Sequence, residues 1–352
     1  MQYFFKKIFY SLLVLLGVVV LVFIMFQGFG DPARMIVGQT GDKKTMDNIR
    51  RDFYLDQPKW KQFFLYLNDV SPVGIHTKAD IVKKELKGFF IGGNSNPDSY
   101  RLGLKFPYLR KSYQTKKNVG TVLMEALPGT LLLAIAAMLF ATIFGILLGV
   151  LAAIKKGTWL DTTAIFASIT GISAPSFFMA IIIAFLFGVV LHPFTGLNLT
   201  GSWFDVDEVT GEKFLTLKNL ILPAFTLGIR PLAIITQLTR SSMLDVLNQD
   251  YIRTAYAKGL DKRTVIFRHA LRNALNPVIT AITGWFAELL AGAFFVEYIF
   301  GWQGIGKITV DALEKLDYPV VMGSVLVSAC IFILINMLAD ILYAVVDPRV
   351  RY

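Results

Sequence analysis

The chain has 352 residues, of which 55% are hydrophobic and 29 are Phe, and its mean hydropathy is +0.56. This composition excludes an ordinary soluble globular protein and indicates an integral membrane protein. The formal net charge of +10 does not indicate nucleic-acid binding, because the basic residues alternate with apolar runs. The single cysteine, Cys330, excludes a disulfide framework and a cysteine metal site.

The first long apolar run covers residues 8–26 and follows Lys6 and Lys7. It is long enough to span a bilayer and lacks the cleavage site of a signal peptide, so we expect a retained first span. Five further apolar runs cover residues 123–154, 162–190, 220–239, 273–295 and 319–346. The sequence therefore predicts an all-α polytopic membrane protein with six membrane-spanning helices.

A polar segment, residues 28–118, separates the first two spans, and turns are indicated in it by Pro58, Pro72, Pro97, Pro107 and a Gly-Gly-Asn-Ser-Asn-Pro stretch. We expect it to form a small external domain. Its excess of lysine does not oppose this placement, because long loops are translocated largely regardless of charge. The predicted division of the chain is a first helix over residues 1–27, this external domain, and a five-helix core over residues 119–352.

The shorter loops set the topology by the positive-inside rule. Lys155, Lys156 and the basic loop 240–272 are expected on the cytoplasmic side. The acidic loop 205–212 and residues 297–317 are expected outside. Both termini are then cytoplasmic.

The segment 250–277 is a long charged stretch between two apolar runs. At helical spacing Ile252, Ala255, Tyr256 and Gly259 share one face, and a second apolar set follows the break after Gly259. The pattern predicts a helix, a glycine turn and a second helix within a cytoplasmic loop, residues 245–277, that binds a partner outside the membrane. A plain basic loop between two spans is the alternative.

The spacing of Ala255, Gly259 and the Asn-Ala-Leu-Asn-Pro sequence at 273–277 resembles the EAA loop of ABC importer permeases, in the dipeptide and oligopeptide branch. Arg253 stands where the motif has Glu, which is common in that branch, and Asn276 replaces an apolar residue. The first span, the Leu-Asp-Gln-Pro sequence at 55–58 and the segment around Asp340 resemble the same family. Residues 71–98 look like an enlargement of its usual external loop.

The resemblance implies a type I importer permease without its own ATPase site, in a bacterial or archaeal cytoplasmic membrane. It implies as partners a second homologous permease, two ATPase subunits that hold ATP and Mg, an external binding protein, a peptide substrate and the lipid bilayer. No cofactor, metal or nucleic acid is expected on this chain. The residues that it implies for ATPase docking are Arg253, Ala255, Tyr256, Gly259, Leu260, Asn273 and Pro277.

The glycine-rich sequence at 301–307 has the spacing of a phosphate-binding loop, G-x-x-x-x-G-K. We reject nucleotide binding, because Ile308 has no hydroxyl for magnesium and the segment is expected outside, away from ATP. It resembles the family segment that caps the translocation pathway externally. Gly304 and Gly306 would then serve a compact re-entrant turn.

Ionisable residues inside spans are costly and face a cavity or a partner. Asp340 has an interhelical hydrogen bond as its alternative role, and Arg230 precedes Pro231 and could satisfy carbonyl groups freed by that proline. Pro175 predicts a hinge or a static kink in the third span. The candidate pathway or gate residues are Arg230, Glu288, Glu297, Gly304, Gly306 and Asp340.

Two other classes of function remain open from the residues. An ion-gradient-driven secondary transporter or channel would use Glu288 and Asp340 and would need no ATP. A membrane scaffold or receptor would use the external domain and transport nothing. Within the importer family the substrate could be a dipeptide, a longer peptide or a metal chelate such as a nickel complex, because the binding protein largely selects it.

Overall fold

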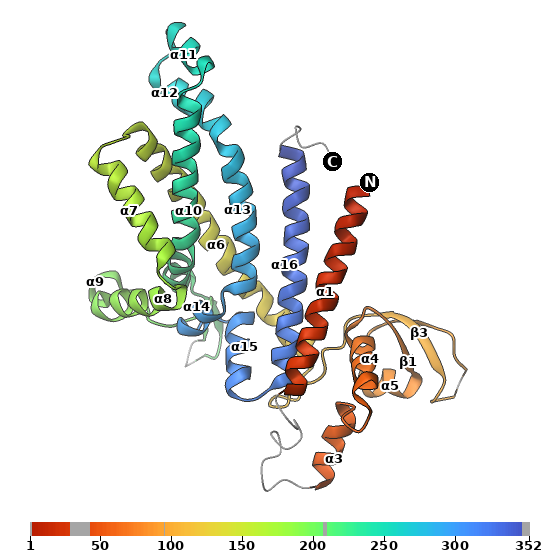
Figure 1. The fold of residues 1–352 in the computed structure, drawn as a ribbon. Helices are drawn as coiled ribbons and strands as arrows, with labels where there is room; N and C mark the ends of the chain where they lie inside the picture. The colour runs from red at the N-terminus through yellow and green to blue at the C-terminus, as the bar shows by residue number, and fades with distance from the viewer. Residues whose placement is uncertain (1, 29–42, 95, 207–209, 347–352) are drawn as a thin grey trace. The chain divides into compact units, whose positions relative to one another are not determined.

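The computed structural model describes residues 2–28, 43–94, 96–206 and 210–346. The chain forms two compact units, residues 1–126 with 308–330 and residues 127–307 with 331–352. Helices α6 (Val119–Ile154) and α16 (Tyr318–Val346) belong to both units (Figure 1). Each unit has its own hydrophobic core. The sequence predicts a division of the chain at residues 27 and 118, according to which segments lie in the membrane and which lie outside it. That division stays a prediction.

Four described helices are long and apolar enough to cross a membrane. They are Lys6–Gln27 within α1 (Gln2–Gly28), α6, Leu217–Leu247 and Tyr318–Ala339 within α16. The helical character of the chain is therefore as predicted. Helix α13 (Arg272–Gly292) covers most of the predicted run 273–295 but is not among these four helices, so six spans stay a prediction.

The predicted span 162–190 is not one straight helix. Helix α7 (Trp159–Ser173) and helix α8 (Ser176–Phe185), which continues into a π-helical turn at Leu186–Val190, are bent by 108° with respect to each other. Pro175 has no amide hydrogen to continue α7, and Ala174 before it takes an extended conformation with ψ 131°. The bent pair counts as a fifth span only if both halves lie in the bilayer.

The part of the amino-terminal unit between α1 and α6, which was predicted to be external, mixes helices and strands. Its helices are α3 (Lys43–Asp52), α4 (Lys59–Val70) and α5 (Lys78–Lys83), and its strands are β1 (Val73–Thr77), β2 (Gly88–Ile91) and β3 (Tyr100–Lys105). The strands form an antiparallel sheet in the order β1-β3-β2. The prediction of an all-α chain was wrong here, because alternating apolar residues between turns form strands rather than helices.

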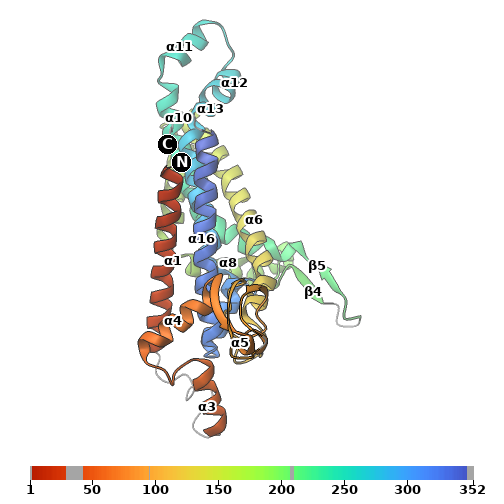
Figure 2. The same ribbon diagram turned by 90° about the vertical axis from the view of Figure 1, so that its right-hand side faces the viewer.

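The core of the amino-terminal unit is rich in aromatic rings. Phe26 at the end of α1 stacks on Phe53 at a centroid distance of 5.5 Å and contacts Tyr318 at 6.4 Å. Val19 and Val22 of α1 and Met322 of α16 are buried in the same cluster. The first turns of α16 therefore pack against α1, as both ribbon views show (Figures 1 and 2).

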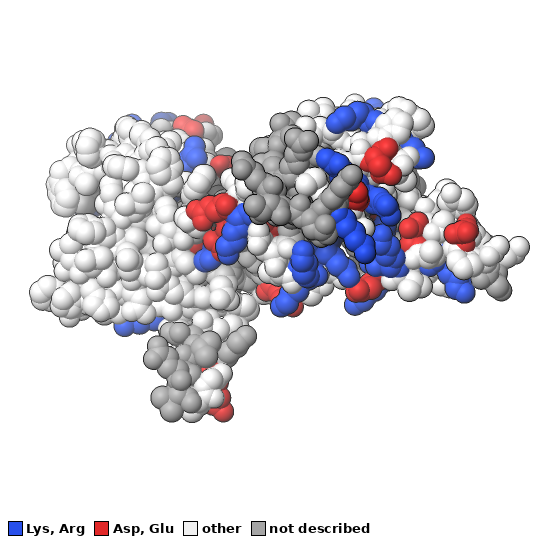
Figure 3. All heavy atoms as spheres, turned by 90° about the horizontal axis from the view of Figure 1, so that it is seen from below, with Lys and Arg blue, Asp and Glu red and all other residues white. Residues whose placement is uncertain are grey.

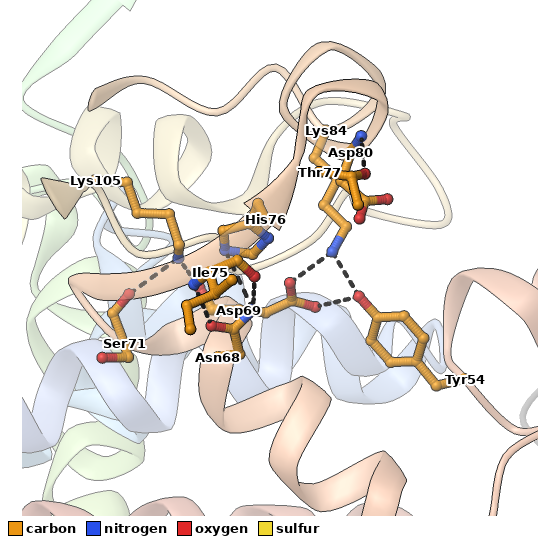
Figure 4. A network of polar contacts seen from close by, with 10 residues as sticks. All are labelled: Tyr54, Asn68, Asp69, Ser71, Ile75, His76, Thr77, Asp80, Lys84 and Lys105. Carbon is orange, nitrogen blue, oxygen red and sulfur yellow. Dashed lines mark hydrogen bonds and ion pairs between the residues drawn. The ribbon is translucent and has the colours of Figure 1, made fainter. Parts of the chain in front are cut away.

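A buried polar network ties together the segments between α1 and α6 (Figure 4). Asp69 at the end of α4 accepts hydrogen bonds from Lys84 at 2.6 Å and from the Tyr54 hydroxyl at 3.0 Å. Lys105 donates to the carbonyl oxygens of Asp69 and Ser71, and burial lowers the pKa of Lys105 to about 8. Burial also raises the pKa of Tyr54. Such a network orders a domain only when its members find partners, as these do.

The carboxyl-terminal unit is built around α6, α7, α8, α10 (Ile221–Leu247) and α13. Its short elements are α9 (His192–Thr195), the hairpin β4 (Phe204–Val206) and β5 (Lys213–Leu215), the 3-10 turn η2 (Leu217–Leu220), α14 (Phe294–Ile299) and the start of α15 (Ile305–Glu314). Gly145 and Gly149 of α6 face α10 so closely that a Cβ would lie 2.8 Å from Ile235 Cγ2 and 2.6 Å from Thr239 Cβ, respectively. Small residues thus bring these two helices together.

Candidate functional site

The loop that follows α10 has the predicted helix, glycine turn and second helix. Helix α11 (Asp250–Ala257) ends at a turn in which Gly259 has φ +78°, a conformation that L side chains rarely adopt. Asp261 then accepts a hydrogen bond from the Thr264 amide at 3.0 Å and caps α12 (Lys262–Thr264). A π-helical turn, η3 (Val265–Leu271), leads into α13.

The inner face of α11 packs against the loop's own second half. Ile252 and Ala255 are buried against Val265, Ile266 and Ala270, together with the end of α6. Ala255, a predicted docking residue, lies inside this core and is only 7% exposed, and its docking role stays a prediction. The small side chain of Ala255 therefore serves the packing of the loop against itself.

The outer face of the loop is aromatic and apolar. Tyr256 and Leu260, both predicted docking residues, are 44% and 38% exposed. Tyr251 and Phe267 are 45% and 50% exposed on the same loop, although the sequence pattern did not single them out. Arg253 is also exposed and lies 3.5 Å from Asp250. Exposed groups of large apolar side chains are typical of interaction sites, with another protein or with a membrane.

The second half of the loop holds the last two predicted docking residues. Asn273 donates to the Tyr251 hydroxyl at 3.1 Å and to the carbonyl oxygen of His269 at 2.8 Å, and so ties the two halves of the loop together. Pro277 lies exposed inside α13, where it removes one helical hydrogen bond. These two residues shape the junction between loop and span.

Arg230 and Glu288 line the same cavity in the carboxyl-terminal unit, which has a volume of about 130 Å³. Its walls come from the break between α7 and α8, from α10 at Pro231 and from α13. The Arg230 guanidinium lies 5.4 Å from the centroid of Trp285, a residue that the sequence did not indicate. The structure thus brings together two of the three charged residues predicted inside spans. The side chain of the third, Asp340, lies outside the described residues.

Glu297 lies in α14, and its buried carboxylate reaches the start of α15. Its Oε2 accepts hydrogen bonds from the amides of Gly306 at 2.7 Å and Lys307 at 3.2 Å. A Cβ at Gly304 would lie 2.3 Å from this oxygen, and one at Gly306 would lie 2.5 Å from Phe294 Cα. Burial raises the pKa of Glu297 to about 7, against the opposing effect of hydrogen bonds from the Thr130 side chain and the two amides.

This geometry explains the glycine-rich sequence. The amides that a phosphate-binding loop would offer to a nucleotide are bound by the chain's own carboxylate. Trp302 is fully buried and donates to the carbonyl oxygen of Gly129 at 2.9 Å, and the Ile305 amide donates to Thr130 Oγ1. The turn is therefore fixed to α6 in a tight packing arrangement that requires Gly304 and Gly306.

Comparisons with known proteins identify the class. Residues 145–352 match the family "Binding-protein-dependent transport system inner membrane component", and residues 1–84 match the amino-terminal model of such membrane components. The first match alone covers more than half of the chain, so the chain belongs to this family. It is a membrane-embedded permease subunit of an ATP-driven importer, in which the ATPase is a separate subunit.

Several relatives are similar along nearly their whole length. The dipeptide transport system permease protein DppB of Alkalihalophilus pseudofirmus is 33% identical, with 96% of each chain covered. DppB of Escherichia coli K12 is 37% identical, with 92% of this chain and 90% of the relative covered. A subunit of the methionine ABC transporter MetNI is 16% identical with a TM-score of 0.50, over 65% of this chain and 97% of that one, and shows the fold alone.

Proposed function

We propose that this chain forms one half of the translocation pathway of an importer for dipeptides or other short peptides. The similarity to the two DppB proteins supports the peptide substrate, and a permease of a glutathione transport system from E. coli, 34% identical over 92% of this chain, points to the same class of small peptide. The cavity that holds Arg230 and Glu288 carries opposite charges that suit the two ends of a zwitterionic peptide, and it would widen during the transport cycle, because about 130 Å³ is below the usual volume of a ligand site. A metal chelate is the alternative substrate.

The proposed mechanism is alternating access driven by partner subunits. Two cytoplasmic ATPase subunits would bind ATP and Mg, a second permease would supply the other half of the pathway, and an external protein would deliver the peptide. The outer face of the loop over Tyr251, Tyr256, Leu260 and Phe267 is the surface proposed to dock on an ATPase. Six spans with both termini in the cytoplasm complete the proposal.

The observation that carries this proposal is the self-packed loop around Gly259. Its inner face is satisfied within the chain, while its outer face leaves four large side chains exposed. The loop is thus rigid enough to transmit a push into α10 and α13, which flank it. An ion-gradient-driven transporter, the second class considered, has no use for such a surface.

The test uses two glycines of similar geometry. Gly259 has φ +78° and Gly157, in the turn between α6 and α7, has φ +76°, and neither has another atom within 4 Å of a built Cβ. Gly259→Val and Gly157→Val therefore impose the same backbone strain, roughly 1–2 kcal/mol. Both variants would be reconstituted with the partner subunits, and peptide uptake, ATPase stimulation and subunit retention would be measured together.

We expect Gly259→Val to lose uptake together with either ATPase retention or its stimulation, while Gly157→Val keeps both. If both variants show normal uptake, ATPase stimulation and subunit retention, the loop is not the element that docks on the ATPase. Uptake that continues without ATP would instead favour the secondary transporter.

A further inference from the structure

A large groove lies in the amino-terminal unit, away from the cavity that holds Arg230. Its volume is about 520 Å³, within the usual range of ligand sites. One wall is apolar and comes from the membrane-spanning helices, with Leu15 and Val19 of α1, Met124 of α6, and Leu326 and Cys330 of α16. The other end is lined by the external domain.

The depth of the groove matches one leaflet of a bilayer. Cys330 lies twelve residues into α16, which begins at Tyr318 next to the external segments. Twelve helical residues rise about 18 Å, and half of a hydrocarbon core is about 15 Å. The apolar wall thus runs from the membrane surface to near the middle of the bilayer.

The external end of the groove is basic. Lys84, Lys87 and Arg110 line it together with Glu85. Lys84 is paired with Asp69 and Glu85 with Lys111, so their charges are compensated. Lys87 is exposed and forms no ion pair within the described part of the chain. This end of the groove therefore carries an excess positive charge.

Arg110 is the most unusual residue of the groove. Its side chain is only 8% exposed, its Cζ lies 4.3 Å from the centroid of Phe53, and its Nε and Nη1 atoms have no hydrogen-bond partner among the described residues. Arg110 and Glu85 also have left-handed backbones, with φ +68° and +55°. Unpaired buried donors are rare and need an explanation such as a bound water or ion, and strained backbone is found most often at ligand sites.

An exposed apolar sheet face continues from the groove. The pairs Val73–Leu104 and Leu104–Phe89 form one cross-strand row, and Ile75, Leu102 and Ile91 form the next; all six residues are more than half exposed. Phe106 continues the alternation of β3, is 74% exposed and lines the groove. The sheet thus turns its apolar side chains outward, while His76 and Lys105 lie on its buried face.

We propose that the groove binds an anionic phospholipid of the external leaflet. Its acyl chains lie along the apolar wall of α1, α6 and α16, and its phosphate lies beside Lys87 and Arg110. The sheet face rests on the same leaflet, where Phe89 and Phe106 act as interfacial aromatic anchors. Basic side chains, with acidic ones among them, gather on the right-hand half of the face seen in Figure 3, which is the end of the amino-terminal unit viewed from below Figure 1. The site does not depend on which solute is transported, and only its leaflet depends on the proposed topology.

Photo-crosslinking tests this site in the complete importer. The complex would be placed in nanodiscs with phosphatidylglycerol that carries a diazirine at the end of one acyl chain, irradiated and mapped by mass spectrometry. We expect label on the segments around Val19, Met124 and Leu326. Lys87→Gln should lower this label about five-fold, the factor that one basic residue near an anionic lipid surface contributes. Lys78→Gln, at an exposed lysine outside the groove, should leave it unchanged.

A second pair of variants tests the apolar wall. Leu15→Trp fills the groove and should reduce the label, whereas Leu16→Trp, on the neighbouring exposed position of α1, should not. Soluble glycerol phosphate in excess should not compete. The proposal would be overturned by equal labelling in all four variants or by competition from glycerol phosphate. It would also be overturned if a thiol crosslinker joined Cys330 to a partner permease, because the groove would then hold a protein in place of the lipid.

Discussion

Glu297 shows how one buried charge gives a glycine-rich turn its sequence requirements. The carboxylate binds two amides at the start of α15, and Gly304 has no Cβ because that carboxylate occupies the space. Larger residues at 304 or 306 would force the carboxylate away from its donors. The turn is therefore defined by a contact between residues nine positions apart, 297 and 306.

Its titration gives a residue-scale prediction. Because the folded protein raises the pKa of Glu297 from 4.5 to about 7, the contribution of this group to stability is fully present below pH 4.5 and is lost as the pH rises to about 7. The slope from this group is roughly 1.4 kcal/mol per pH unit. Glu297→Gln should remove this fall, so that the variant gains in Tm over the wild type between pH 5 and 7. Thermal unfolding of the purified wild type and the purified variant between pH 5 and 7 measures this difference in Tm.

The matched control is Glu125→Gln, at an exposed position of α6. It should keep the pH dependence of the wild type. If Glu297→Gln and the wild type have parallel profiles, the carboxyl group is ionised throughout this range, and burial does not control its protonation.

Individual residues also show where sequence alone was sufficient. Gly259 could be placed in a turn, because a helical apolar face stopped at a glycine followed by an Asp cap. The amides that bind Glu297 could not be predicted, because nothing in the sequence indicates which backbone amides a carboxylate nine residues away reaches. Tyr251 and Phe267 were missed for a similar reason, since only folding decides which apolar residues of an amphipathic loop remain exposed.

At the scale of elements, the two faces of α11 predict different effects of the same substitution. Ile252→Asp places a charge in the loop's own core and should destabilise the loop by about 3–5 kcal/mol. Tyr256→Asp places it on the outer face and should leave the fold intact while weakening ATPase retention. Limited proteolysis of the loop, together with co-purification of the ATPase, distinguishes the two results.

Failure would take a clear form for this pair. A Tyr256→Asp protein that resists proteolysis and still retains normal amounts of ATPase would show that the outer face does not dock. An Ile252→Asp protein that is as resistant as the wild type would show that the inner face is not packed as described.

The elements that were predicted best from the sequence are those with a long run of apolar residues. Helices α1, α6, α10 and α16 lie close to the predicted runs, because composition alone defines a span. The sheet β1-β3-β2 was missed because its strands are only four to six residues long and their apolar side chains face outward. The bend of 108° at Pro175 is larger than the hinge or kink that was predicted there. A proline in the sequence indicates a break in a helix but not the angle between its two halves.

At the scale of the whole molecule, topology is the remaining prediction. In a Cys330→Ser background, Lys78→Cys should react with a membrane-impermeant maleimide in intact cells whose outer barrier has been removed. Lys262→Cys should react only after the membrane is opened, because its loop is expected in the cytoplasm. The reverse pattern of labelling would invert the whole chain, and with it the leaflet of the lipid site.

The glycines between α6 and α10 restrict how a transport cycle can move the carboxyl-terminal unit. Gly149 lies so close to α10 that a built Cβ would be 2.7 Å from the Thr236 carbonyl oxygen, which leaves no space for one helix to slide along the other. We therefore expect these two helices to travel as a single rigid body, so that a force that reaches α10 through α11 also moves α6. The break between α7 and α8 lines the charged cavity at Gly171, Ala174 and Ser176. Rotation at this break is the motion that would change the size of the compartment around Arg230 and Glu288 without separating α6 from α10.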